Sequence, residues 1–199
     1  MYAVVYGHSY VRRLGDYIDD MGNNFTNFGF DGTRLQVLCS GVGGGKVYPG
    51  RKSLQASVNT AALSEYEPHI CFLQAGENDI NIDTFNTETA TKLATALINF
   101  AAFLQHSFSI NHIIIGQLLP RMTSGFTRCV VEVNKALQQQ LATNDHTCIH
   151  FWHHRGFWQD PSQLFSRDGV HFNDKGTMKY AKSVRAALGT HLKKYYPPQ

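Results

Sequence analysis

Short apolar runs of strand length recur along the chain, at residues 3–6, 35–38, 70–73, 113–115 and 148–151. Apolar runs of this length are typical of strands that are covered on both faces of a parallel sheet. The pattern therefore predicts five parallel strands.

The segments between these runs have a helical period. Apolar side chains recur every three or four positions in residues 93–104, 130–141 and 178–192, and a helix-like stretch covers residues 11–21. Strands that alternate with helices predict right-handed crossovers and a three-layer α/β/α sandwich, a flavodoxin-like doubly wound fold. In such folds the functional site lies beyond the carboxyl ends of the strands.

Length and composition agree with one compact unit. The chain has 199 residues, 43% of them hydrophobic, which predicts a single domain over residues 1–199, although a segment cut from a longer polypeptide would look the same. The formal charge is only +3. Nucleic-acid binding through Arg12, Arg13, Lys193 and Lys194 is therefore not expected of this unit alone.

The cysteines and the start of the chain bear on the compartment. The four cysteines form no CxxC pair, so we expect reduced thiols and an intracellular, cytoplasmic protein. No signal-peptide pattern follows Met1. The longest apolar stretch, residues 93–104, is too short to span a bilayer.

Small residues that could belong to a catalytic or binding site follow two of the predicted strands. Ser9, after Gly7 and His8, falls at a strand-to-helix turn, where backbone N–H groups favour developing negative charge. An isolated serine there is more simply an N-cap. The glycine-rich residues 40–46 follow the next strand. They fail the Walker A pattern, because Ser40 and Val47 replace its first glycine and its hydroxyl, and a flexible loop is the alternative.

Polar residues follow the third strand and precede the last helix. Asn78 could donate to an oxyanion, or could simply form a turn with Asp79. Asp168 lies three positions before His171, a spacing that lets the carboxylate hold imidazole Nδ1 and leave Nε2 free to take a serine proton. The alternatives are that Asp168 caps the approach to the last helix and that His171 is a solvated or core histidine. Together these segments supply a nucleophile, oxyanion donors, a base and its orienting acid at one sheet edge.

The four segments resemble the sequence blocks of the SGNH (GDSL-like) hydrolases. The blocks are Gly7-His8-Ser9, the glycines around Gly44, Gly76-Glu77-Asn78-Asp79 and Asp168-Gly169-Val170-His171. The GxSxG elbow of the α/β-hydrolases is missing, since Val11 replaces its second glycine. The resemblance implies that Ser9, His171 and Asp168 form a catalytic triad. It also implies that Ser9, Gly44 and Asn78 form the oxyanion hole.

One departure and two narrower likenesses accompany this resemblance. His8 stands where the family has an aspartate. Residues 113–121 look like a strand and loop of platelet-activating-factor acetylhydrolase-type members. Residues 7–14 are similar to the esterase domain of the first open reading frame of some LINE-type retrotransposons. That likeness would imply an RNA-binding, self-associating polypeptide and a membrane as partners.

The remaining candidates concern a metal and a substrate pocket. Cys148, His150, His153 and His154 lack the spacing of a zinc site, so no metal is expected. Trp158 and Phe172 are expected to contact substrate. The cluster Trp152, Phe157, Trp158 and Phe165 could wall an acyl pocket, pack a loop, or splay outward onto lipid.

These patterns predict a serine esterase that acts on short-acyl esters and needs no cofactor. The expected partner is a small ester, either a lipid or an acetylated sugar, and the oligomeric state stays open. The alternative is a catalytically silent binding module of the same fold, carried by a retrotransposon or another nucleic-acid-associated protein.

Overall fold

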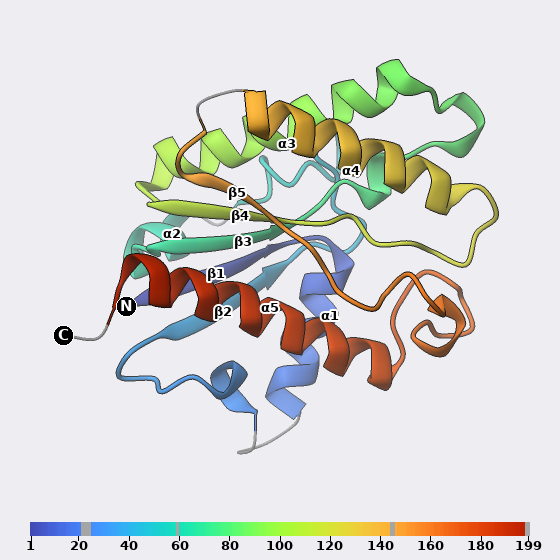
Figure 1. The fold of residues 1–199 in the computed structure, drawn as a ribbon. Helices are drawn as coiled ribbons and strands as arrows, with labels where there is room; N and C mark the ends of the chain where they lie inside the picture. Colours follow the sequence, from blue (N-terminus) through green and yellow to red (C-terminus); the bar gives the residue numbers. More distant parts are fainter. Residues whose placement is uncertain (21–24, 59, 144–145, 198–199) are drawn as a thin grey trace.

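The computed structural model describes residues 1–20, 25–58, 60–143 and 146–197. Five parallel strands form one sheet in the order β2-β1-β3-β4-β5. The strands are β1 Tyr2–Gly7, β2 Gln36–Gly41, β3 Ile70–Gln74, β4 His112–Gly116 and β5 Ile149–Trp152. The predicted parallel sheet is confirmed (Figure 1).

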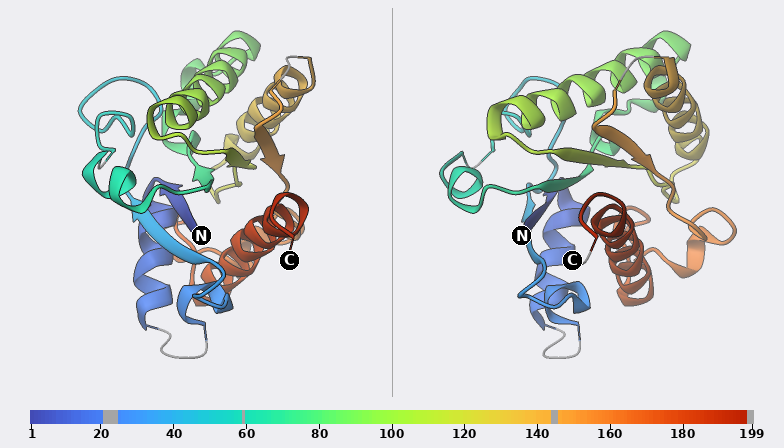
Figure 2. Two further views of the ribbon diagram at one scale, coloured as in Figure 1. Left: turned by 90° about the vertical axis from the view of Figure 1, so that its left-hand side faces the viewer. Right: turned by 60° about the vertical axis from the view of Figure 1, so that its left-hand side comes forward.

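Helices cover both faces of the sheet (Figures 1 and 2). One face carries α2 (Thr60–Tyr66), α3 (Thr87–Phe108) and α4 (Phe126–Thr143), and the other carries α1 (Ser9–Asp20) and α5 (Asp174–Tyr195). The three helical repeats in residues 93–104, 130–141 and 178–192 lie within α3, α4 and α5. The first helix begins two residues earlier than expected, and its predicted last residue, Met21, lies outside the described residues.

Two strand boundaries differ from the prediction for a local reason. The expected strand at residues 35–38 is shifted, because the Leu35 amide closes a turn on the Asp31 carbonyl at 2.9 Å. Cys148 ends a turn instead of opening β5, and its side chain is half-buried. Cys71 is buried in β3, and all four cysteines are free thiols.

The apolar side chains form two layers of core. One lies between the sheet and α3 and α4, and the other between the sheet and α1 and α5. All five residues of β3 are buried, as expected of a central strand in a doubly wound sheet. No described helix is long and apolar enough to cross a membrane.

The topology brings distant segments to one edge. β1 pairs with β2 on one side and with β3 on the other, so the chain changes direction across the sheet at β1. A switch of this kind opens a crevice at the carboxyl ends of the neighbouring strands. The residue that follows β1 and His8 at this point is Ser9.

Candidate active site

Ser9 is the first residue of α1 and follows a tight turn. A Cβ atom at Gly7 would lie 2.0 Å from the Gln74 carbonyl oxygen, and the His8 amide donates to that same oxygen at 3.2 Å. The His8 carbonyl accepts from the Val11 amide at 3.0 Å, which starts the helix. The Ser9 hydroxyl therefore sits at a helix N-terminus, where the dipole and free N–H groups favour negative charge.

His171 lies between Ser9 and Asp168. Its Nε2 atom is 3.2 Å from Ser9 Oγ, and its Nδ1 atom is 2.7 Å from Asp168 Oδ2. A carboxylate only accepts hydrogen bonds, so Nδ1 carries the proton and Nε2 accepts from the Ser9 hydroxyl. The structure thus brings the three predicted triad side chains into one hydrogen-bonded row.

A short turn before α5 holds Asp168 in place. Its Oδ1 atom accepts from the amides of Val170 at 2.9 Å and His171 at 2.8 Å. The turn passes through Gly169 at φ +64°, where a Cβ atom would lie 2.8 Å from Met122 Cβ. The backbone hydrogen bond from His171, with that of its side chain, holds the pKa of Asp168 well below its usual range. The carboxylate therefore stays ionised.

The residues predicted to bind an oxyanion lie on adjoining loops. The end of β2 packs on the first turn of α1, since a Cβ atom at Gly41 would lie 2.1 Å from the Arg12 amide nitrogen. Gly44, in the loop after β2, has φ +70°. Asn78 follows β3, and its Nδ2 atom donates to the Gly45 carbonyl at 3.0 Å.

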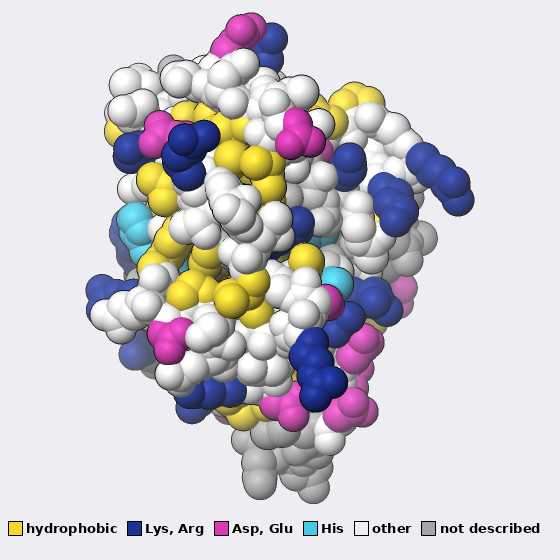
Figure 3. All heavy atoms as spheres, turned by 90° about the vertical axis from the view of Figure 1, so that its right-hand side faces the viewer, with side chains coloured by type: hydrophobic (Ala, Val, Ile, Leu, Met, Phe, Trp, Pro, Cys, Tyr) yellow, Lys and Arg dark blue, Asp and Glu magenta, His cyan; other side chains and the backbone are white. Residues whose placement is uncertain are grey.

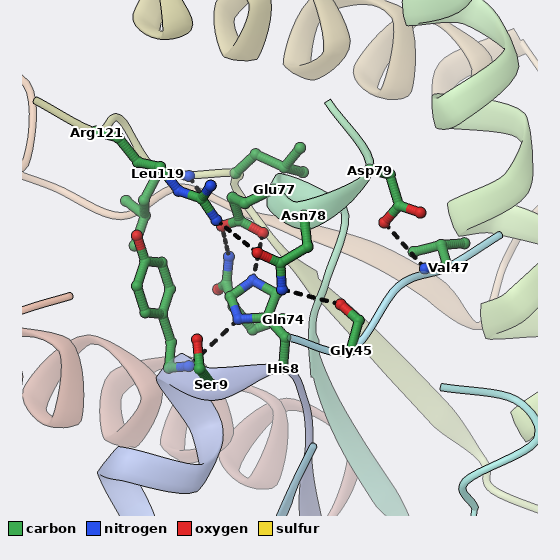
Figure 4. A network of polar contacts seen from close by, with 12 residues as sticks. His8, Ser9, Gly45, Val47, Gln74, Glu77, Asn78, Asp79, Leu119 and Arg121 are labelled. Atoms are coloured by element: carbon green, nitrogen blue, oxygen red, sulfur yellow. Dashed lines mark hydrogen bonds and ion pairs between the residues drawn. The ribbon is translucent and has the colours of Figure 1, made fainter. Parts of the chain in front are cut away.

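Two charged residues near these loops have contacts that the sequence patterns did not reveal (Figure 4). Arg121 Nη2 donates to Asn78 Oδ1 at 2.8 Å. Asp79 accepts from the amides of Val47 at 2.9 Å and Tyr48 at 3.1 Å. Burial raises the pKa of Asp79, although these two hydrogen bonds oppose the shift. Asp79 thus anchors the loop that carries Gly44.

A buried histidine–glutamate pair lies behind Ser9. His8 Nε2 is 2.7 Å from Glu77 Oε2, and neither side chain is exposed. Glu77 Oε1 accepts from Gln74 Nε2 at 2.7 Å and the Leu119 amide at 3.1 Å. Burial alone would raise the pKa of Glu77, but attraction to His8 and the hydrogen bonds from the His8 ring and the Leu119 amide lower it. His8, at the position of the family's aspartate, is thus bound to a carboxylate from another loop.

His154 extends this network away from Ser9. Its ring nitrogens contact Gln74 Oε1 at 3.0 Å and Ser183 Oγ at 2.8 Å, and burial lowers its pKa to about 3. His154 is therefore a neutral hydrogen-bonding group, while His153 is exposed. The described residues contain no group of three or more metal-ligating side chains.

The aromatic residues before α5 are mostly part of the core. Phe157, Phe165 and Phe172 are buried against α5, so outward splay onto a lipid surface is wrong for Phe157 and Phe165. Phe172 stacks on Tyr10 with ring centroids 4.6 Å apart. Trp158 is half-buried. Figure 3 views the carboxyl end of the sheet, where hydrophobic side chains gather among polar ones.

Trp152 is half-buried and bound to α5. Its Nε1 atom donates to Ser183 Oγ at 3.0 Å, the same hydroxyl that contacts His154. The indole is therefore tied to the packing of β5 on α5.

The chain is similar to several solved esterase structures. An acetyl xylan esterase, AlAXEase, has a TM-score of 0.69 at 18% identity, covering 94% of this chain and 100% of that one. A carbohydrate esterase family 3 structure from Talaromyces cellulolyticus has a TM-score of 0.65 at 18% identity, covering 98% and 99%. A lipase/acylhydrolase from Enterococcus faecalis has a TM-score of 0.64 at 16% identity, covering both chains fully at 100%.

A search of curated proteins found no match. The likeness to the retrotransposon esterase domain stays a prediction. The family model named GDSL-like Lipase/Acylhydrolase, in contrast, matches residues 6–184, a span that includes Ser9, Asn78, Asp168 and His171. The predicted resemblance is thereby confirmed, and the chain belongs to the GDSL-like lipase/acylhydrolase family of carboxylic ester hydrolases.

Proposed function

We propose that this chain is a serine esterase in which Ser9, His171 and Asp168 act as a catalytic triad. The observation that carries the proposal is the row of contacts from Asp168 Oδ2 to His171 Nδ1 at 2.7 Å and from His171 Nε2 to Ser9 Oγ at 3.2 Å. This geometry suits removal of the hydroxyl proton by a neutral imidazole whose tautomer is set by a carboxylate.

The reaction then has two halves. His171 takes the Ser9 proton as Oγ attacks the ester carbonyl, and the protonated imidazole returns that proton to the leaving alcohol. The oxyanion is held by the amides of Ser9 and Gly44 and by the Asn78 side chain. Water, deprotonated by His171, then attacks the acyl-Ser9 ester, and the imidazolium returns that proton to Ser9 Oγ as the carboxylic acid leaves. No step requires a cofactor.

The proposed substrates are esters of short acyl chains, acetyl above all. Phe157 and Phe165 both pack on Phe172, with ring centroids 5.4 Å and 5.0 Å from that of Phe172, so these rings hold one another in place beside His171. Trp158, half-buried beside them, and Phe172 are the proposed acyl contacts. Two of the similar structures are described as an acetyl xylan esterase and an acetyl esterase, which supports an acetylated sugar over a long-chain lipid.

A panel of p-nitrophenyl esters from acetate to palmitate, run beside Ser9→Ala, tests this function. We expect kcat/KM to be highest for acetate or butyrate and turnover to be lost in Ser9→Ala, while circular dichroism shows an unchanged fold. An optimum at octanoate or beyond, in solution or on vesicles, would exclude the short-acyl specificity. Wild-type turnover in folded Ser9→Ala would exclude the mechanism. A wild-type protein that binds esters without turnover would be a silent binding module.

A further inference from the structure

Arg121, in the loop after β4, is bound to the side chain of Asn78. Arg121 Nη2 donates to Asn78 Oδ1 at 2.8 Å, and Asn78 Nδ2 donates to the Gly45 carbonyl at 3.0 Å. In Figure 4 the Asn78 amide lies between these two partners. The three residues follow β4, β3 and β2 in turn. One chain of hydrogen bonds therefore joins three loops at the carboxyl edge of the sheet.

The two partners leave only one orientation for the Asn78 amide. A guanidinium only donates hydrogen bonds and a carbonyl oxygen only accepts them, so Oδ1 must face Arg121 and Nδ2 must face Gly45. A flipped amide would place donor against donor and acceptor against acceptor. Since Nδ2 carries two hydrogens and the bond to Gly45 uses one, the other is left for an oxyanion.

Arg121 is itself held by packing. Its Cζ atom lies 4.6 Å from the centroid of the Phe126 ring, at the first residue of α4. Its Nε atom is buried and has no hydrogen-bond partner among the described residues, so solvent and ligand do not reach it. A guanidinium above an aromatic face is attracted to the ring. The Arg121 side chain is thus fixed between Phe126 and Asn78.

We infer that Arg121 is a positioning residue of the oxyanion hole, an inference that rests on the proposed function. It holds the Asn78 N–H toward the carbonyl under attack by Ser9. Its charge on Oδ1 also polarises the amide, which strengthens the N–H as a donor. The carbonyl oxygen becomes fully negative only after attack, so the contribution of Arg121 is larger in the transition state than in the bound ester.

The first test compares three single variants on p-nitrophenyl acetate. Arg121→Met should lower kcat about 10- to 100-fold and change KM by less than about twofold, because the loss falls on the transition state. Arg121→Lys should recover part of kcat, since lysine keeps the charge and a donor but loses the planar fork. Arg128→Met removes an exposed arginine from α4, the helix that begins at Phe126, and should match the wild type.

A double-mutant cycle distinguishes positioning from direct catalysis. If Arg121 acts through Asn78, adding Arg121→Met to Asn78→Ala should lower kcat no further. Multiplicative losses would overturn the inference, and so would a change confined to KM, which would place Arg121 on the substrate. If Arg121→Met does not fold by circular dichroism, Arg121→Lys takes its place in the cycle.

The outcome of Ser9→Ala is separate from this cycle. Turnover that persists in Ser9→Ala would remove the proposed function itself. If turnover is lost in Ser9→Ala and the losses in the cycle are multiplicative, the esterase mechanism is kept and only the positioning role of Arg121 is ruled out.

Discussion

His171 Nε2 and Ser9 Oγ lie 3.2 Å apart although the two residues are separated by 162 positions in the sequence. The contact depends on two local structures at opposite ends of the chain. One is the tight turn from β1 into α1, and the other is the turn through Gly169 that Asp168 stabilises. Both must form before the pair can act in catalysis.

Asp168→Asn should lower kcat by about 1,000- to 10,000-fold, because an amide can donate to Nδ1 and favour the wrong imidazole tautomer. The fold should be unaffected, since the Oδ1 atom of an asparagine can still accept from the Val170 and His171 amides that hold the turn. Steady-state kinetics on p-nitrophenyl acetate measures the effect. Asp160→Asn, an exposed aspartate earlier in the same connection, serves as the control. Loss of less than about tenfold in Asp168→Asn would argue against its orienting role.

Ester turnover should fall on acidification, because only a neutral His171 imidazole accepts the Ser9 proton. Protonation of Asp168 should not cause a second loss of turnover in acid, since the backbone hydrogen bond from His171 keeps the pKa of Asp168 well below its usual range. The profile of kcat/KM against pH should therefore show a single acid limb. A value of kcat/KM that did not fall on acidification would count against His171 as the base.

Asn78→Ala should lower kcat by about 100- to 1,000-fold with little change in KM, as expected when one oxyanion donor is removed. Its amide also bridges Gly45 and Arg121, so thermal unfolding should be recorded beside the kinetics. A lower melting temperature with unchanged kcat would show that Asn78 serves the turn and not the reaction.

Glu77→Gln should destabilise the fold by about 1–3 kcal/mol, because it leaves a buried hydrogen-bond donor without an acceptor. The carboxylate accepts from His8, Gln74 and the Leu119 amide, whereas a glutamine turns an NH2 group toward one of these donors. Urea unfolding measures the loss. Glu88→Gln, in an exposed pair with Lys92, should change stability little. Equal losses of stability in Glu77→Gln and Glu88→Gln would show that the buried pair contributes no more to the free energy of unfolding than the exposed one.

Stability should decrease as the pH falls from about 6.5 toward 4. Burial lowers the pKa of His150 to about 4, with repulsion from His191 and His112 adding to the shift. The folded state therefore binds fewer protons than the unfolded state in this window. The contribution of His150 to the free energy of unfolding is fully present above the window and falls on acidification. Burial of His154, with its pKa lowered to about 3, acts in the same direction.

Urea midpoints at pH 7 and pH 5 test this for the wild type and His150→Phe. The difference between the two midpoints should be smaller in His150→Phe and unchanged in His153→Gln, which alters an exposed ring. An identical pH dependence in all three proteins would exclude His150 as a source of the acid sensitivity.

Hydrophobic periodicity was enough to predict the sheet and the helices α1, α3, α4 and α5, because buried strands and one-sided helices leave regular patterns. It did not predict the short helix α2. It could not place the start of β2, which depends on a hydrogen bond from Leu35 to Asp31. The neighbouring positions of Ser9, Asp168 and His171 followed from the rule that parallel strands deliver their carboxyl ends to one edge.

The supporting residues were not predictable in the same way. His8 and Glu77 are 69 positions apart, and a glutamate in a turn motif looks the same in sequence whether it is buried or solvated. His8 itself was a signal, since a histidine beside the nucleophile in place of an aspartate calls for an acidic partner. Arg121 gave a weaker signal: it ends the segment 113–121 that resembles the platelet-activating-factor acetylhydrolase-type members, but an arginine in a loop is normally solvated.

The separation of Ser9 from His171 also bears on how the enzyme is made. During synthesis the proposed nucleophile is translated 162 residues before its proposed base. Phe172, next to that base, packs on Tyr180 of α5 with ring centroids 5.7 Å apart. A nascent chain that has not yet reached α5 therefore carries the serine without the helix that supports its base.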